Sequence, residues 1–392
     1  MKFCGIICEF NPFHNGHRYI IEQAKKQTGE DVICLMSGNF VQRGSASIEN
    51  KYERAKKAIF NGATAVVEFP TIYACSNAEN FAMGAIHILN KLNVDTLAFG
   101  IENTNLNALQ KIAKLKYENS ERFQNAFKNE IQNGINYNTA LKRSIATTLN
   151  DKTIFEILNK PNNILAIEYL TALLKTKSKI KPLAINRCDN GYYSSTENNE
   201  FLSASQIRTD ILNGKNIDKF VPKNAKITNF FDKNAENCLK SIQLLKLRTT
   251  DPVDLEKFYD YNEGIEYRVS KLSKSSINLD ELKANVVTAR YREQRVNKLL
   301  LYPLLNITKK TVKNSFTCKP AVKLLAIDKE NKKLLTSYNK NKITLIKNNK
   351  DYEILSKKQK EIIDIDLNAG ELYQTIINEP GNQDKKIGTL FI

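Results

Sequence analysis

The sequence of 392 residues contains little histidine, no Cys-x-x-Cys motif and no apolar run long enough to span a membrane. Its cysteines are scattered, at Cys4, Cys8, Cys34, Cys75, Cys188, Cys238 and Cys318. An odd number of widely spaced cysteines argues against a disulfide framework and predicts reduced thiols in the cytoplasm. Because neither a signal peptide nor a spanning segment is evident, we expect a soluble protein that does not associate with membranes.

Acidic side chains are fewer than basic ones. The chain carries 59 basic and 42 acidic residues, a net charge of +17. Residues 1–110 hold 10 of each sign, so the whole excess lies in residues 111–392. Residues 281–320 alone hold nine basic side chains against Glu281 and Glu293. This clustering predicts a polyanionic partner such as a nucleic acid, although a composition rich in Lys and Asn is the alternative explanation.

Short apolar segments alternate with amphipathic stretches in the first half of the chain. The apolar segments cover residues 3–10, 31–37, 63–69, 94–99 and 180–185, and helical patterns cover residues 17–28, 49–61, 77–92 and 164–174. This alternation predicts an α/β fold with a parallel sheet covered by helices on both faces. Cys4 and Cys8 lie inside the first apolar run, which favours core positions over a metal-binding pair. Residues 105–150 are polar and helical, and we expect an insertion or lid there.

Two of the three histidines, His14 and His17, lie in one turn directly after the first predicted strand. The order of strand, turn and helix places them where an open α/β sheet binds its ligand. The first turn of a helix presents unpaired N–H groups that suit a phosphate, and Gly16 lets the backbone come close. The imidazoles add two further hydrogen-bonding groups. A zinc site is the weaker alternative, because no third ligand follows at a suitable spacing.

Several longer stretches carry a resemblance to known proteins. They are GIICEFNPFHNGH at residues 5–17, MSGNFVQRG at 36–44, FGIEN at 99–103, PNNILAIEYL at 161–170 and SASQIR at 203–208. HNGH resembles the HxGH signature of the nucleotidyltransferase superfamily. The ordered set resembles the bacterial tRNA(Met) cytidine acetate ligase family, from residue 1 to about residue 330.

The resemblance implies an organisation and a reaction. We expect a Rossmann-like nucleotidyltransferase core at residues 1–220, a mainly helical basic tRNA-binding domain at 221–318 and a small β-containing tail at 319–392. The implied enzyme uses ATP, together with Mg²⁺, to convert acetate to acetyl-adenylate. It then transfers the acetyl group to N4 of the wobble cytidine of elongator tRNA(Met), which gives N4-acetylcytidine. No protein partner is expected.

The resemblance also implies site residues. His14 and His17 are the expected catalytic residues. The expected ATP-binding residues are Ile7, Cys8, Glu9, Phe10, Asn11, Pro12, Phe13, His14, Asn15, Gly16, His17, Arg18, Gly100, Asn162, Arg187, Ser205 and Arg208. The expected tRNA-binding residues are Arg290, Tyr291, Arg292 and Arg295. Residues 279–305 form a long basic amphipathic stretch, in which we expect Arg292 and Arg295 to share one helical face and Tyr291 to stack on a base.

Several assignments stay open at this level. Either Asn162 or Asn163 fits the expected ATP contact, and either fits a helix cap. Gly100 suits a turn as well as a close nucleotide contact. Gln42 and Arg43 fit substrate contact or loop solvation equally. The alternative functions are an adenylyltransferase for a small metabolite and a non-catalytic RNA-binding protein.

Overall fold

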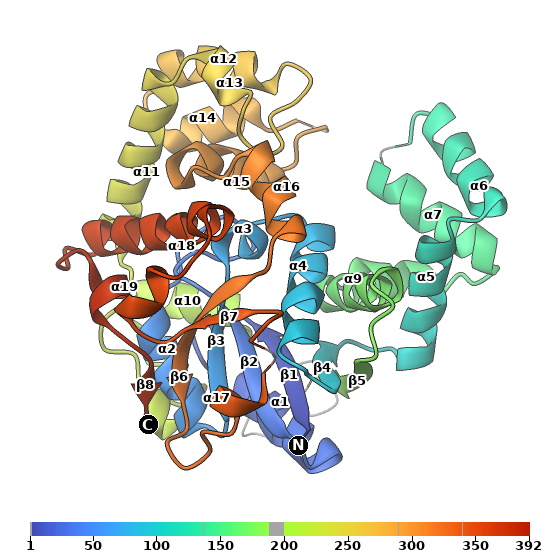
Figure 1. The fold of residues 1–392 in the computed structure, drawn as a ribbon. Coiled ribbons are helices and arrows are strands. Elements are labelled where there is room, and N and C mark those ends of the chain that lie inside the picture. The colour runs from blue at the N-terminus through green and yellow to red at the C-terminus, as the bar shows by residue number, and fades with distance from the viewer. Residues whose placement is uncertain (1, 136, 188–199, 289, 339) are drawn as a thin grey trace.

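The computed structural model describes residues 2–135, 137–187, 200–288, 290–338 and 340–392 (Figure 1). A central sheet is built from seven strands in the order β5-β4-β1-β2-β3-β6-β7, and β8 pairs with β6. The strands are β1 (Phe3–Cys8), β2 (Asp31–Ser37), β3 (Ala65–Phe69), β4 (Thr96–Ile101), β5 (Lys181–Asn186), β6 (Ala321–Ile327), β7 (Thr344–Ile346) and β8 (Leu390–Phe391). The first five are parallel to one another, so the predicted α/β fold is confirmed.

Helices cover both faces of this sheet, and alternate side chains of each strand explain why. Phe3, Ile33 and Val67 belong to the core on one face, together with residues of α4 and α9. Cys4 and Cys34 belong to the core on the other face, together with residues of α1 and α2. Strands buried on both sides need the continuous apolar runs that the sequence shows. The helices are α1 (Asn15–Thr28), α2 (Lys51–Phe60), α3 (Thr71–Ala74), α4 (Ala78–Lys91), α9 (Pro161–Lys175) and α10 (Ala204–Leu212).

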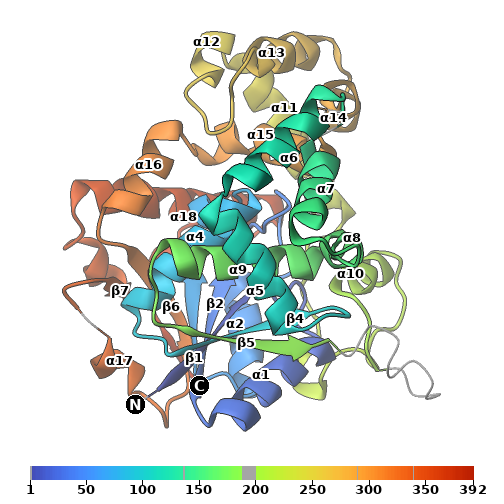
Figure 2. The ribbon, with the colours of Figure 1, turned by 90° about the vertical axis from the view of Figure 1, so that its right-hand side faces the viewer.

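The predicted helical insertion at residues 105–150 contains α5 (Leu106–Glu118), α6 (Glu121–Gln132) and α7 (Tyr137–Leu149), and α8 (Ile154–Asn159) follows it. It packs on the sheet indirectly, through α5 and α8 against α9. Figure 2 shows α6 and α7 above α5 and α9, and Figure 1 shows them at the right-hand edge of the molecule. The outer part of the insertion therefore extends away from the sheet.

The basic region folds as a group of helices above the carboxyl ends of the parallel strands (Figure 1). It contains α11 (Lys233–Thr249), α12 (Pro252–Leu255), α13 (Ile265–Ser275), α14 (Leu279–Val286), α15 (Glu293–Leu305) and α16 (Lys309–Thr317), and a 3-10 helix, Lys223–Ala225, precedes it. The basic amphipathic stretch at residues 279–305 forms two helices, α14 and α15. The chain leaves α14 at Val286 and restarts at Glu293, with Arg292 in the extended backbone conformation of an N-cap.

The tail contains β strands, as predicted, and it joins the central sheet. β6 pairs antiparallel with β3, with Ala65 opposite Ile327, and β7 and β8 flank β6. The remaining elements are α17 (Leu334–Ser337), the 3-10 helix Asn349–Tyr352, α18 (Lys357–Ile376) and α19 (Gln383–Lys386). The division of the chain into three domains stays a prediction, but the last segment does not stand apart from the first.

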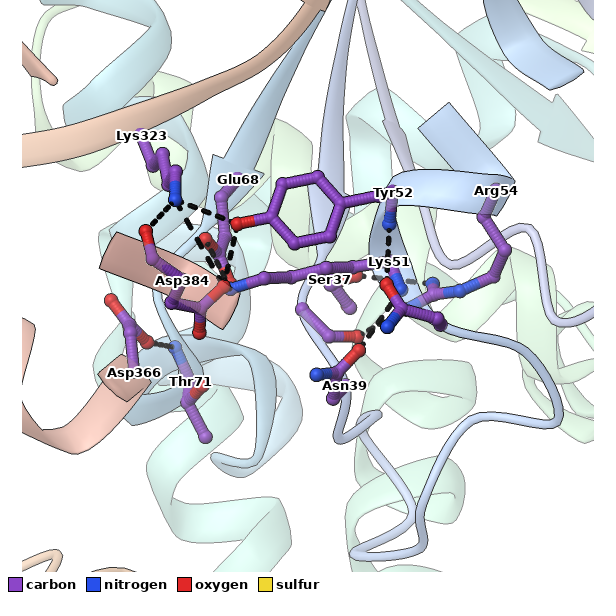
Figure 3. Close-up of polar contacts among 12 residues, drawn as sticks. Ser37, Asn39, Lys51, Tyr52, Arg54, Glu68, Thr71, Lys323, Asp366 and Asp384 are labelled. Atoms are coloured by element: carbon purple, nitrogen blue, oxygen red, sulfur yellow. Dashed lines mark hydrogen bonds and ion pairs between the residues drawn. The ribbon is translucent and has the colours of Figure 1, made fainter. Parts of the chain in front are cut away.

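A buried ionic cluster fixes α19 to the core (Figure 3). The Lys51 ammonium lies 2.7 Å from a Glu68 oxygen and 2.9 Å from an Asp384 oxygen, and all three side chains are nearly inaccessible. Lys323 of β6 donates to the Tyr52 hydroxyl at 2.6 Å. Because buried charges are tolerated only when paired, these contacts fix the position of the C-terminal segment.

No helix within the described ranges is long and apolar enough to cross a membrane. The six cysteines in the described part of the chain are free, and Cys188 lies outside it. Cys4 and Cys8 are buried core residues.

Candidate active site

A cavity of about 580 Å³ opens at the carboxyl ends of β1, β2, β4 and β5. It lies beside the neighbouring strands β1 and β4, where the order of the parallel sheet reverses. In open α/β folds this is where ligands bind. Its charged lining, within the described residues, consists of Glu9, Arg43, Arg187, Arg208 and Lys298, so positive charge dominates.

The two histidines form the first turn of α1 together. The Nδ1 atom of His14, the N-cap, accepts the N–H of Gly16 at 3.0 Å, and the Nδ1 atom of His17 accepts the N–H of His14 at 3.3 Å. This reciprocal arrangement is a capping box made of two imidazoles. The sharp exit from β1 is made by Phe10, whose φ of 46° is rare for a bulky residue and whose ring is fully buried.

The hydrogen bonds at Nδ1 determine what each ring can offer a ligand. A nitrogen that accepts an N–H carries no proton, so the proton of each neutral ring lies on Nε2. Burial and the nearby His14 and Arg187 lower the pKa of His17 well below its ordinary value. His17 is therefore neutral at pH 7 and can donate from Nε2. Both histidines line the cavity, next to the N–H groups of the first turn of α1.

A second helix start, that of α10, supplies a hydroxyl and a guanidinium. Ser203 is the N-cap and accepts the N–H of Gln206 at 3.3 Å. Ser205 lies two residues further on and lines the cavity. Ser203 therefore caps the helix, and Ser205 is the serine placed to contact a ligand. The Arg208 guanidinium donates to the carbonyl oxygen of Asn11, so it joins α10 to the turn after β1.

The β4 and β5 strands form the opposite wall of the cavity. Gly100 lies inside β4 rather than in the loop after it, paired with Ile185. A Cβ atom at residue 100 would approach Cγ of Arg187 to 3.2 Å. The absence of a side chain there leaves room for the aliphatic part of Arg187, which also lines the cavity.

The structure distinguishes the two asparagines. Asn163 is fully buried, and its amide group exchanges hydrogen bonds of 2.8 Å with the backbone N–H and carbonyl of Glu102. Asn162 lines the cavity, and its Nδ2 donates to the Glu102 carboxylate. Asn162 is thus the one placed to meet a ligand, while Asn163 fixes the loop behind it.

Not every predicted ATP residue reaches the cavity. Its lining does not include Pro12, Phe13, Asn15 or Arg18. Phe13 is buried against Phe10 and His17. The Asn15 amide donates to two backbone carbonyls, and Arg18 pairs with Glu22 on the exposed side of α1. Helix α3, which follows β3, does not line the cavity, whereas Gln42 and Arg43 in the loop after β2 do.

Arg54 holds the backbone behind the site, a role that the sequence analysis did not predict. This arginine on α2 is fully buried, and its guanidinium donates to the carbonyl oxygens of Glu9, Ser37, Gly38 and Glu49. Four carbonyls, from the turn after β1, the end of β2 and the loop between β2 and α2, therefore converge on one cation, and Figure 3 shows Arg54 with Ser37. A buried arginine on a helix resembles a solvated surface residue in sequence, so only the fold reveals this role.

Helix α15 also reaches the cavity, through Gln294 and Lys298. The Lys298 ammonium donates to the carbonyl oxygen of Ser76 at 3.2 Å. This contact links the basic helical region to the loop after β3. The sequence placed Lys298 in an expected RNA-binding helix, and its position beside the nucleotide cavity was missed.

The predicted tRNA-binding residues differ in how accessible they are. Tyr291 is 7% exposed, and the Arg295 guanidinium lies 4.9 Å from its ring centroid. Arg295 forms two hydrogen bonds with Asp260, of 2.7 and 2.8 Å, and Arg290 pairs with Glu263. Arg292 is exposed, and burial, followed by the charge of Arg292, lowers the pKa of Lys142 on α7. The prediction that Arg292 and Arg295 share one helical face is wrong, because Arg292 precedes the first residue of α15.

A family model described as HIGH Nucleotidyl Transferase matches residues 1–387. Among curated relatives, the tRNA(Met) cytidine acetate ligase of Thermoanaerobacter sp. (strain X514) is 37% identical over 343 residues, which cover 86% of this chain and 85% of that protein. The protein of the same name from Acetivibrio thermocellus is 36% identical, with the same shares covered. The crystal structure of Thermotoga maritima TmcAL bound with alpha-thio ATP has a TM-score of 0.88 at 24% identity, with 100% of both chains covered. The apo form of that protein gives 0.89 at 25% identity.

Proposed function

Because the chain belongs to the tRNA(Met) cytidine acetate ligase family, we propose that it joins acetate to N4 of the wobble cytidine of elongator tRNA(Met), with ATP as the energy source. The observation that carries this proposal is the cavity itself. It brings together His14, His17, Gly100, Asn162, Arg187, Ser205 and Arg208, which lie far apart in sequence, at the ligand-binding edge of the sheet. The reaction has two steps.

In the first step, a carboxylate oxygen of acetate attacks the α-phosphorus of ATP. An acyl–phosphate bond forms, the bond to the β-phosphate breaks, and pyrophosphate leaves. This step needs positioning and charge stabilisation rather than a covalent enzyme intermediate. The Nε2 protons of His14 and His17 and the start of α1 are suited to the phosphate oxygens, and Ser205 and Arg208 to the departing pyrophosphate.

ATP is expected to enter as its Mg²⁺ complex, as part of the substrate. Glu9 is the acidic side chain of the described cavity lining, and one of its oxygens already accepts the N–H of Gln42 at 3.0 Å. The lining thus lacks the several carboxylates of a resident magnesium site. Within the described residues, no cluster of His, Cys, Asp or Glu has the arrangement of a metal site. Mg²⁺ held by the phosphates themselves would neutralise part of their charge.

In the second step, the cytidine N4 amine attacks the acetyl carbonyl carbon. An amide bond forms, AMP leaves, and the amine loses a proton. The helices α11 to α16 stand above the carboxyl ends of the parallel strands (Figure 1), and α15 contributes Gln294 and Lys298 to the cavity lining. An RNA lying on these helices can therefore extend one nucleotide into the cavity. We assign Arg290, Arg292 and Arg295 to this RNA surface, and we expect the reaction to take place in the cytoplasm, where tRNA is used.

The experiment that tests this function supplies ATP, labelled acetate and bulk bacterial tRNA. We expect label in tRNA(Met), as N4-acetylcytidine detected by mass spectrometry of nuclease digests, with one pyrophosphate released per acetyl group. If no RNA were labelled and a small metabolite were adenylylated in the presence of ATP, the protein would be a metabolite adenylyltransferase instead. RNA binding without pyrophosphate release would leave the non-catalytic alternative.

A further inference from the structure

The end of the cavity farthest from β5 is closed by three segments that contact one another. Cys75 donates through Sγ to the carbonyl oxygen of Val41, 3.6 Å away, which joins the loop after β3 to the loop after β2. Lys298 of α15 donates to Ser76 in the first of these loops. In the second loop, Gly44, with φ of 74°, lies so close to α15 that a Cβ atom there would approach the backbone N of Lys298 to 3.1 Å.

The strand order separates this end from the groups assigned to the nucleotide. Gly100 belongs to β4, Arg187 follows β5, and the histidines follow β1. Val41 follows β2, while Ser76 follows β3, on the far side of β1 from β4. Neighbouring strands lie about 4.8 Å apart, so the two ends of the cavity are roughly three strand spacings apart. ATP bound along β1, β4 and β5 therefore leaves the end beneath Lys298 open for a second substrate.

The side chains at this end have the chemistry of a small-carboxylate site. Lys298 supplies an ammonium group with three N–H donors. Within the described part of the chain, the structure shows one of them engaged, by Ser76, so two remain for an anion. Val41, which is buried, and Ala78, which is half-buried, are apolar residues of this part of the lining. The carboxylate of Glu9 also lines the cavity and would repel a bound anion. A second anion beside ATP therefore needs a nearby cation such as Lys298.

We propose that acetate binds at this end of the cavity, with its carboxylate on the Nζ atom of Lys298 and its methyl group against Val41 and Ala78. This inference rests on the proposed function, and it assigns the acyl substrate to a residue of the basic helical region. The same helix, α15, begins beside Arg292. Acetate capture at Lys298, in the middle of α15, and RNA contact at the start of α15 thus belong to one rigid element.

Acetate-dependent ATP–pyrophosphate exchange tests this without RNA. Lys298→Met keeps most of the side-chain length and removes the charge. We expect its KM for acetate to rise about 10- to 100-fold, the usual effect of losing a charged hydrogen bond, and its KM for ATP to stay within about twofold. Lys310→Met, at an exposed lysine of α16, is the matched control and should change neither constant. An unchanged KM for acetate in Lys298→Met, or an equal rise in both constants, would overturn the assignment.

A second variant tests the methyl pocket independently, even if Lys298→Met does not fold. Val41→Ala removes two methyl groups from the apolar wall and so enlarges the space beside the acetate methyl group. The ratio of kcat/KM for propionate to that for acetate in the exchange reaction should rise about tenfold. An unchanged propionate-to-acetate ratio would refute the methyl contact. If the wild-type protein showed no acetate-dependent exchange, the proposed function would fail together with this inference. Exchange in the wild type with no effect of either variant would refute the inference alone.

Discussion

The backbone N–H of His14 donates to Nδ1 of His17, and the two imidazole rings stack with centroids 3.7 Å apart. Each ring therefore serves the first turn of α1 through Nδ1, and both residues also line the cavity. Structure and chemistry share the same side chains here. A loss of activity in an alanine variant would thus mix a lost helix cap with a lost proton donor.

Asparagine at residue 14 separates the two roles. Asn is among the best N-cap residues, so the free energy of unfolding of His14→Asn should lie within about 0.5 kcal/mol of the wild-type value. That of His14→Ala should be lower by about 1 kcal/mol. Both variants lack the imidazole and should lose about 100-fold or more in exchange rate. Urea unfolding and exchange assays on the pair provide the comparison. Near-normal exchange in His14→Asn would show that the ring acts only as a cap.

The arginines of the RNA surface should have unequal effects. Arg292→Ala removes an exposed cation and should weaken tRNA binding, with the slope of log affinity against log salt concentration reduced by about one. Arg295→Ala instead leaves Asp260 without its partner and should lower stability as well. Filter binding at several salt concentrations measures the slope. If Arg292→Ala kept the full slope, this end of α15 would not be part of the RNA surface.

The buried cluster of Lys51, Glu68 and Asp384 should dominate the stability of the C-terminal segment. Lys51→Met leaves two carboxylates buried without their main cation, and we expect a loss of about 3 to 5 kcal/mol in the free energy of unfolding. The exposed pair of Lys56 and Glu53 is the control, since Lys56→Met should cost about 0.5 kcal/mol. Equal effects of the two variants in urea unfolding would contradict the structural role of the cluster.

His87 should make the protein sensitive to acid. Burial, followed by the charge of Lys91, lowers the pKa of His87 to about 4, below the value near 6.5 expected in the unfolded chain. As the pH falls, the unfolded state takes up the proton first, so stability declines from about pH 6.5 to pH 4. His87→Leu should remove roughly 2 kcal/mol of this decline after allowance for partial exposure. Parallel pH profiles of unfolding for the two proteins would refute the assignment.

The sequence predicted the strands and helices of the nucleotide-binding core because their apolar runs are continuous and their helix starts are marked by local residues. His14, Ser203 and Pro161 mark helix starts whichever partners the helices later meet. The short-range pattern was therefore sufficient for the core and for much of the cavity lining.

Long-range pairing could not be predicted in the same way. A helical pattern at residues 279–305 does not show that the chain breaks before Glu293, since the break is stabilised by Arg295 binding Asp260. Similarly, Arg54 and Lys298 act through carbonyl groups of distant loops, which carry no sequence signal. The pairing of β6 with β3 joins residues about 260 apart along the chain. Contacts of this kind depend on the final packing.

The most direct test of the account is ATP–pyrophosphate exchange without RNA, measured for the wild-type protein and for a variant with alanine at both His14 and His17. The account predicts exchange that requires acetate in the wild type and falls by about 1,000-fold or more in the double variant, while tRNA binding is retained. Exchange that does not depend on acetate, or near-normal exchange in the double variant, would contradict it.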